Sequence, residues 1–190
     1  DASNTIIDDL SSVFTDADNN NSLITKIVEA NTNPGLVSAS ISGNTLTLDY
    51  QADQNGSATI TIRGTSNGLS VADEFTVTVT AVNDAPSFTQ GSDKTVLEDS
   101  GSNTYSNWVT DISTGPSDEN NQSATFTLTN TNNSLFSSQP AINSDRKLTF
   151  TPASNANGSA TVTIILSDNG GGDDTYADQT FTITVTPVAD

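Results

Sequence analysis

The side chains of this chain that could do chemistry are carboxylates and amides gathered in short polar loops. The clearest cluster is Asp16-Ala17-Asp18, which three asparagines follow directly. Carboxylate and amide oxygens are the ligands that Ca²⁺ prefers, and it takes about six to eight of them. An EF-hand is excluded, because Asn21 stands where that loop needs glycine and Ile27 stands where it needs a bidentate Glu. Taken alone, such a cluster favours a solvated turn over a metal site.

Cysteine and histidine are both absent from the chain. Their absence excludes disulfides, Cys/His zinc sites and nucleophilic catalysis by a Ser–His or Cys–His pair. A glycosidase would need two carboxylates about 5–9 Å apart in a cleft, whereas these acids fall in loops with few aromatic residues nearby. We therefore expect a protein that is not an enzyme. Trp108, Tyr105 and Tyr176 could form a sugar-stacking platform, but core packing is the favoured role for Trp108.

The charge balance is strongly acidic. Asp and Glu number 23 against 5 Lys and Arg, which gives a net charge of −18, and the two halves divided after Asp84 share it equally. Such a field repels nucleic-acid phosphates and attracts divalent cations, although much of it serves solubility. No apolar run approaches the about 18 residues of a membrane span. We expect neither nucleic acid nor membrane insertion among the interactions of this chain.

An internal repeat sets the domain organisation. Residues 55–62 read NGSATITI and residues 157–164 read NGSATVTI, and FTVTVTAVND at 75–84 likewise returns as FTITVTPVAD at 181–190. Alternation of apolar residues with threonine is typical of strands with one buried face, and turn clusters every 8–12 residues or so are typical of a β-sandwich. The pattern predicts an all-β chain with one module over residues 1–84 and a second over residues 85–190.

Further elements are predicted from shorter patterns. No helix is predicted beyond a single turn over residues 9–14, which Asp9 can cap and which would put Leu10, Val13 and Phe14 on one side. Additional strands are expected near residues 23–29, 36–41, 86–97, 104–109 and 123–130.

Four motifs, in order along the chain, resemble the bacterial cadherin-like repeats of large secreted surface proteins, such as the extender modules of RTX-type adhesins. They are the FTDAD loop at 14–18, the DQNG turn at 53–56, the VNDAP junction at 82–86 and the SDNGG turn at 167–171. No single motif is specific, but the four in this order are, and together they span nearly the whole chain. The resemblance implies two tandem immunoglobulin/cadherin-like β-sandwiches, joined end to end by a short linker.

The resemblance also implies Ca²⁺ at the junction between the modules. Its ligands would come from the end of one module, the linker and the near end of the next. By position these are Asp53 from the first module, Asn83 and Asp84 from the linker, and Asp118, Glu119 and Asp168 from the second module. Two end sites are implied as well: Asp16 and Asp18 would face a preceding module, and Glu98 would face a following one.

Three differences between the copies favour the central junction over the two ends. In each pair the acid or amide lies on the side of that junction: Asp53 against Asn155, Asp168 against Ser66, and Asn83 against Ala189. Repulsion among the converging carboxylates predicts a hinge without Ca²⁺ and a stiffer rod with it.

The function implied by the resemblance is structural. We expect a monomeric piece of a longer protein, secreted or on the bacterial cell surface, whose partners are neighbouring repeats of the same polypeptide and whose junction is rigidified by Ca²⁺. The alternative is a module that binds polysaccharide or protein in a calcium-dependent way. A spacer between catalytic domains of a secreted enzyme is a third reading.

Overall fold

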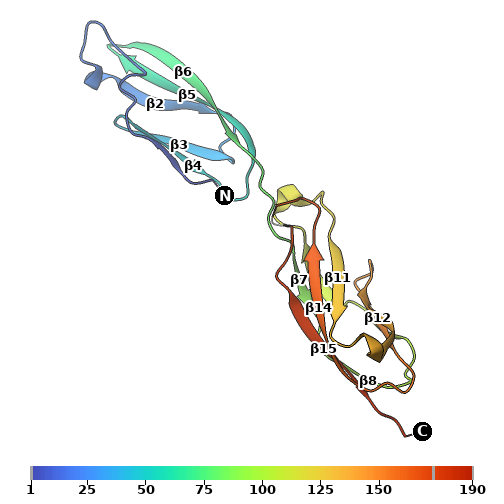
Figure 1. Cartoon of the computed structure of the whole chain (residues 1–190). Coiled ribbons are helices and arrows are strands. Elements are labelled where there is room, and N and C mark those ends of the chain that lie inside the picture. The colour runs from blue at the N-terminus through green and yellow to red at the C-terminus, as the bar shows by residue number, and fades with distance from the viewer. Residues whose placement is uncertain (1, 173, 190) are drawn as a thin grey trace. The chain divides into compact units, whose positions relative to one another are not determined.

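The computed structural model describes residues 2–172 and 174–189. Within them the regular structure is fifteen β-strands and three one-turn 3₁₀ helices, with no α-helix (Figure 1). The chain divides into two compact units, Asp1–Val82 (unit 1) and Asn83–Asp190 (unit 2). The predicted all-β class is confirmed, and the division falls two residues before the predicted boundary after Asp84.

Unit 1 is built from two three-stranded antiparallel sheets. One has the order β1 (Thr5–Ile7), β4 (Thr45–Tyr50), β3 (Val37–Ser42), and the other has the order β2 (Thr25–Asn31), β5 (Gly56–Ser66), β6 (Leu69–Val79). A 3₁₀ helix, η1 (Asn21–Leu23), precedes β2. On β5, Ala58, Ile60 and Ile62 are buried while the threonines between them are half-buried, so the period-2 alternation turns one face of the strand into the core.

Unit 2 repeats this plan with three additional strands among its described residues. Its larger sheet has the order β11 (Thr125–Asn130), β14 (Gly158–Ser167), β15 (Gln179–Thr186), β8 (Lys94–Leu97), with β8 parallel to β15. A second sheet has the order β12 (Phe136–Ile142), β13 (Leu148–Pro152), β9 (Asn103–Tyr105), and β7 (Ser87–Gln90) pairs with β10 (Val109–Ser113). The short helices are η2 (Ser117–Glu119) and η3 (Asn133–Leu135).

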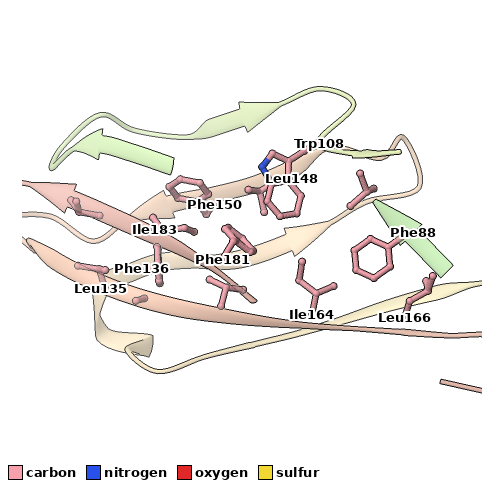
Figure 2. Packing of buried hydrophobic residues seen from close by; sticks show 14 residues of the cluster. Phe88, Trp108, Leu135, Phe136, Leu148, Phe150, Ile164, Leu166, Phe181 and Ile183 are labelled. Carbon is pink, nitrogen blue, oxygen red and sulfur yellow. The ribbon is translucent and has the colours of Figure 1, made fainter. Parts of the chain in front are cut away.

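The core of unit 2 is aromatic at its centre (Figure 2). Trp108 is 4% exposed, its ring centroid lies 4.4 Å from that of Phe181, and its Nε1–H donates to the Ser92 carbonyl at 3.1 Å. Tyr105 and Tyr176 pack against the same core. The prediction that Trp108 is a core residue is confirmed, and these three rings do not form an exposed sugar-stacking platform.

Two sequence predictions differ from the structure for packing reasons. The strand predicted over 86–97 is two strands, β7 and β8, separated near Gly91, where an added Cβ would lie 2.6 Å from the Trp108 indole nitrogen. The strand predicted over 104–109 is also divided, because β9 ends at Tyr105 and the chain turns before Trp108 enters the core.

The single turn predicted over residues 9–14, with Asp9 as its cap, is confirmed, but Val13 does not lie on the buried side with Leu10 and Phe14. Asp9 Oδ1 accepts the Ser11 N–H at 2.8 Å, the Val13 N–H reaches the Leu10 carbonyl at 3.2 Å, and no helix follows. Leu10 and Phe14 are buried and Val13 is 41% exposed, so the segment is a turn that places two side chains in the core.

Candidate metal centre

Three segments of unit 2 meet where the unit begins: residues 83–84, the helix η2 with the turn after it, and the turn after β14. The Asp84 N–H donates to Glu119 Oε1 at 2.9 Å. The Asn83 side-chain amide donates to Asp168 Oδ1 at 3.3 Å and accepts from the Gln122 side-chain amide at 2.6 Å. These contacts bring carboxylates from two distant parts of the sequence to one pair of residues.

Local backbone bonds hold Glu119 in place. Its N–H donates to the Pro116 carbonyl at 3.0 Å, and its own carbonyl accepts the Gln122 N–H at 2.9 Å and the Thr114 hydroxyl at 3.0 Å. Gly115 has a φ of +140°, and a Cβ there would lie 1.7 Å from Glu119 Oε2. Glycine at 115 therefore makes room for the carboxylate.

The turn after β14 is fixed in a similar way. Asp168 Oδ1 accepts the Gly170 N–H at 2.9 Å, and the Asp168 N–H donates to the Asp174 carbonyl at 2.9 Å. Asn169 Oδ1 accepts the Ser123 N–H at 2.8 Å, which ties this turn to the segment after η2. A Cβ on Gly170 would meet Asn83 Oδ1 at 1.7 Å, so only glycine lets the turn approach Asn83 so closely.

The two carboxylates are buried and only half satisfied. Glu119 is 6% exposed and Asp168 is 8% exposed. Glu119 Oε2, Asp168 Oδ2 and Gln122 Oε1 are buried and have no hydrogen-bond partner among the described residues. An unsatisfied buried polar atom costs about 1–3 kcal/mol, and more when it is charged.

No basic side chain of the described residues neutralises this pair. The ion pairs among those residues join Arg63 to Glu29 and Lys147 to Asp145. An uncompensated buried charge is costly, and a bound cation is one way to offset it.

The chemistry of the donors fits a hard divalent cation. All the unsatisfied atoms are carboxylate or amide oxygens, which suit Ca²⁺ rather than zinc. The described residues contain no group of three or more His, Cys, Asp or Glu that could hold a metal ion. A cation here would therefore have two carboxylates, and the rest of its shell would come from amide oxygens, backbone oxygens and water.

The other predicted ligands near the start of unit 2 lie at its surface. Asp118 is exposed on η2, one residue before Glu119. The side chain of Asp84 is exposed, although its backbone N–H is bonded to Glu119. The structure therefore brings Asn83, Glu119 and Asp168 together through their side chains, and Asp84 joins them through its main chain.

Asp53 belongs to unit 1, where it is exposed in the turn after β4. Its φ is +56°, and Asn155, its counterpart in unit 2, has a φ of +54°. Asp and Asn tolerate this left-handed conformation better than most residues do. The backbone alone thus accounts for an Asp or Asn at both positions.

The DAD loop of unit 1 is internally satisfied. The Asp16 carboxylate accepts the N–H groups of Asp18 at 3.0 Å and Asn19 at 3.1 Å, as well as the Asn19 side-chain amide at 3.1 Å. A hydrogen bond from the Ser66 side chain, followed by these bonds, lowers the pKa of Asp16. Asp18 is exposed. This is the arrangement of a closed Asx turn.

Glu98 lies at the ends of β8 and β15, and it is 5% exposed. Its Oε1 accepts the Val188 N–H at 2.8 Å and its Oε2 accepts the Asn157 side-chain amide at 3.2 Å. Both oxygens therefore have protein partners, whereas Glu119 Oε2 has none among the described residues.

Gln122 and Asn169 are members of the cluster that the sequence did not single out. Asn169 lies inside the SDNGG turn, so the motif contained it without indicating its role. Gln122 lies in a run of polar residues that carries no spacing signal, and its part follows only from its contact with Asn83.

No protein-family model matches the chain, and no curated protein does either. Solved structures do match. A crystal structure of human Protocadherin-24 EC1-2 (Form II) is 16% identical, over 92% of this chain and 86% of that one, with a TM-score of 0.54. A second crystal structure of human Protocadherin-24 EC1-2 is 14% identical over the same shares, with a TM-score of 0.52. The Protocadherin gammaB7 EC3-6 structure is 18% identical over 88% of this chain and 41% of that one, with a TM-score of 0.50.

At these identities the likeness concerns the fold. The chain has the fold of two tandem cadherin-like domains. In the described part of the chain, no helix is long and apolar enough to cross a membrane.

Proposed function

We propose that the chain forms two extender modules of a large, repetitive bacterial surface adhesin, and that Ca²⁺ bound at the start of unit 2 orders the linker. The observation that carries the proposal is the pair of buried, unpartnered oxygens, Glu119 Oε2 and Asp168 Oδ2. The cadherin-like fold and the net charge of −18 support it. The protein would be secreted or held at the cell surface, monomeric, with neighbouring repeats of the same polypeptide as its partners.

Bound Ca²⁺ would supply the positive charge that the carboxylate pair lacks. Glu119 and Asp168 would be its anionic ligands, and Gln122 Oε1 a neutral one. Two carboxylates about 5 Å apart repel by roughly 3 kcal/mol at an effective dielectric near 20.

The cluster is hydrogen-bonded directly to the linker residues. Glu119 and Asp168 also bond the Asp84 N–H and the Asn83 side chain. Fixing the two carboxylates would therefore fix residues 83–84. Participation of Asp53, Asp118, Asp16, Asp18 and Glu98 as further ligands stays a prediction.

Calorimetry tests the site. Titration of Ca²⁺ into the chain should give a saturable binding isotherm. Glu119→Gln combined with Asp168→Asn should abolish the part of the heat that comes from binding to unit 2. The matched control is Asp111→Asn, which removes an exposed carboxylate of unit 2 at a residue whose φ of +51° asparagine tolerates. Equal isotherms for the double variant and the control would sink the calcium proposal.

X-ray scattering tests the mechanical part. With Ca²⁺ the distribution of interatomic distances should become narrower. With chelator it should become broader, because the linker samples more conformations. A maximum dimension that is the same in both conditions, in a sample shown by calorimetry to bind Ca²⁺, would remove the rigidifying role and leave the site intact.

The alternative is calcium-dependent binding of polysaccharide or protein. Its simplest form, stacking of sugars on Trp108, loses support because that ring is buried in the core. A glycan array with and without Ca²⁺ separates the two functions, since an extender module gives no calcium-dependent signal.

A further inference from the structure

Lys26 is a lysine at a core position of unit 1. It is 8% exposed, and on β2 it pairs with Gly64 of β5. In unit 2 the repeated strand has Leu166 at the position of Gly64, and Leu166 pairs with Phe126. Phe126, which packs against the core of unit 2, is therefore the counterpart of Lys26. An amine thus occupies in one copy the place that an aromatic ring fills in the other.

The amine of Lys26 contacts a side-chain amide. Its Nζ donates to Asn44 Oδ1 at 2.8 Å, and none of the ion pairs among the described residues includes it. Asn44 lies in the turn between β3 and β4, so the contact joins the two sheets of unit 1. The carbon bonded to that oxygen, Asn44 Cγ, is the electrophilic atom of the amide. A nucleophile and its target are therefore held close together.

Asp9 brings a carboxylate to the same amide. The Leu10 N–H donates to the main-chain carbonyl of Asn44 at 2.9 Å, which holds Asp9 next to Asn44. The pKa of Asp9 is lowered, first by hydrogen bonds from the side chain and the N–H of Ser11, and to a smaller extent by attraction to Lys26. An amine, an amide and a carboxylate therefore converge from three separate segments of unit 1.

The corresponding positions of unit 2 carry none of these groups. There the Trp108 N–H donates to the Arg146 carbonyl at 2.9 Å, so Arg146 is the counterpart of Asn44. Asn107, one residue before Trp108, is the counterpart of Asp9. Together with the phenylalanine on β11, these residues replace the amide, the carboxylate and the amine. The three groups therefore occur as a set in unit 1.

We propose that unit 1 forms an intramolecular isopeptide bond between Lys26 and Asn44, with Asp9 as the proton carrier. The bond would tie β2 to the turn between β3 and β4 and so link the two sheets covalently. The chain has no cysteine, so a disulfide cannot supply such a link. A bond that closes the loop of residues 26–44 restricts the unfolded chain as a disulfide does. It would keep the sheets of unit 1 together under tension, and it does not depend on Ca²⁺.

The reaction conserves atoms, electrons and charge. The Lys26 ammonium gives one proton to the Asp9 carboxylate, and the neutral amine attacks Asn44 Cγ. A second proton passes from the attacking nitrogen to Nδ2 as the bond between Cγ and Nδ2 breaks, and ammonia leaves. Ammonia then takes the proton from Asp9, so the products are a secondary amide, an ammonium ion and the restored carboxylate. No oxidant or cofactor is needed, and the exposure of Asn44 lets ammonia escape to solvent.

Intact mass spectrometry of the full chain, kept at neutral pH until its mass is constant, is the first test. We expect a mass lower than that of the sequence by one ammonia, about 17 Da. Trypsin cleaves after an unmodified lysine or arginine but not after an acylated lysine. It should therefore leave residues 1–63 as one fragment, whereas an unlinked chain gives residues 1–26 and 27–63.

A second digestion distinguishes the link from cyclisation of an asparagine to a succinimide, which also releases ammonia. Cleavage after Glu29 separates Lys26 from Asn44 along the chain. The two peptides should stay joined, and their fragmentation should locate the join at these two side chains.

Three variants and a control assign the roles. Asn44→Ala and Lys26→Met should each show the full mass of the variant sequence. Asp9→Asn keeps the oxygen that accepts the Ser11 N–H but removes the carboxylate, so it should slow the appearance of the linked fragment by about a hundredfold or more. Asn4→Ala, which removes another exposed asparagine of unit 1, should leave the link unchanged.

Three results would overturn the proposal: a chain that keeps its full sequence mass, cleavage after Lys26 despite a loss of ammonia, or the same loss of ammonia in Asn44→Ala. The first two need no variant, so they hold even where a variant does not fold. Linking of Asp9→Asn at the unchanged rate would overturn the role assigned to Asp9.

Discussion

Two acidic clusters contain similar residues but differ in how their carboxylates are satisfied. One is the loop of Asp16 in unit 1, and the other is the cluster of Glu119 in unit 2. Asp16 accepts hydrogen bonds from its own loop, and its neighbour Asp18 is exposed. Glu119 and Asp168 are buried, and each has an oxygen without a partner. The conspicuous DAD motif is thus a closed turn, and the plainer SDE segment forms the cation-binding candidate.

A few substitutions between the copies produce this difference. Asp168 stands where unit 1 has Ser66, and the Ser66 side chain bonds Asp16 instead of adding a second carboxylate. Glycines at 115 and 170 let Glu119 and Asn83 approach their neighbours closely. The burial of the carboxylates, more than their number, distinguishes the cluster whose charge is left uncompensated.

The largest expected effect is a difference between the two units in how much Ca²⁺ raises their free energy of unfolding. At about 100 times its dissociation constant, a ligand of the folded state adds roughly 2.7 kcal/mol to the free energy of unfolding. We expect that gain for unit 2 in urea unfolding followed by the fluorescence of Trp108, the only tryptophan of the chain. Amide exchange on β5 should show little change in unit 1; an equal gain in both units would contradict the comparison.

Gly115→Ala should break the site in unit 2. The new Cβ would displace Glu119 Oε2 and strain a φ of +140°, so we expect a loss of about 2 kcal/mol or more together with the loss of calcium binding. Gly43→Ala is the control in unit 1, because that residue has a φ of +61° and open space around it. It should cost about 1–2 kcal/mol and leave calcium binding unchanged; loss of binding in the control would undermine the argument.

Substitutions at Asp53 separate the effect of its charge from the effect of its backbone conformation. Asp53→Asn should change the free energy of unfolding by less than about 0.5 kcal/mol, because Asn155 holds the same left-handed backbone in unit 2. Asp53→Ala should cost about 1 kcal/mol for the lost tolerance of positive φ. If Asp53 is also a calcium ligand, as the sequence predicts, Asp53→Asn weakens calcium binding without loss of stability, and calorimetry on the two variants separates these effects.

The smallest effect concerns pH. The pKa of Asp16 is lowered, first by the Ser66 side chain and then by the loop amides. The contribution of these bonds is present above the ordinary pKa of the group, 3.8, and is lost as the pH falls through its lowered value. Ser66→Ala should raise the pKa measured by carboxyl NMR, and an unchanged titration would show that the hydroxyl plays no part.

The sequence predicted the strands better than it predicted the site. Threonine alternation identified β5, β6, β14 and β15, because a strand with one buried face leaves that pattern. It did not predict the break at Gly91, which results from the approach of Trp108 across the sandwich.

For the site, the family resemblance supplied Asn83, Glu119 and Asp168, but not their rank. Burial and missing hydrogen bonds distinguish Glu119 from its neighbour Asp118, and both are properties of the packed chain. Gln122 was beyond prediction, because its role is a contact with a residue far away in the sequence.

The most direct test of the central claim is a Ca²⁺ titration of the ¹⁵N-labelled chain followed amide by amide. We expect saturable shifts at Asp84, Ser123 and Gly170, whose N–H groups bond the cluster, with smaller changes at Asp18 and Asn19. Saturable shifts confined to Asp18 and Asn19, with Asp84 and Gly170 unmoved, would contradict it.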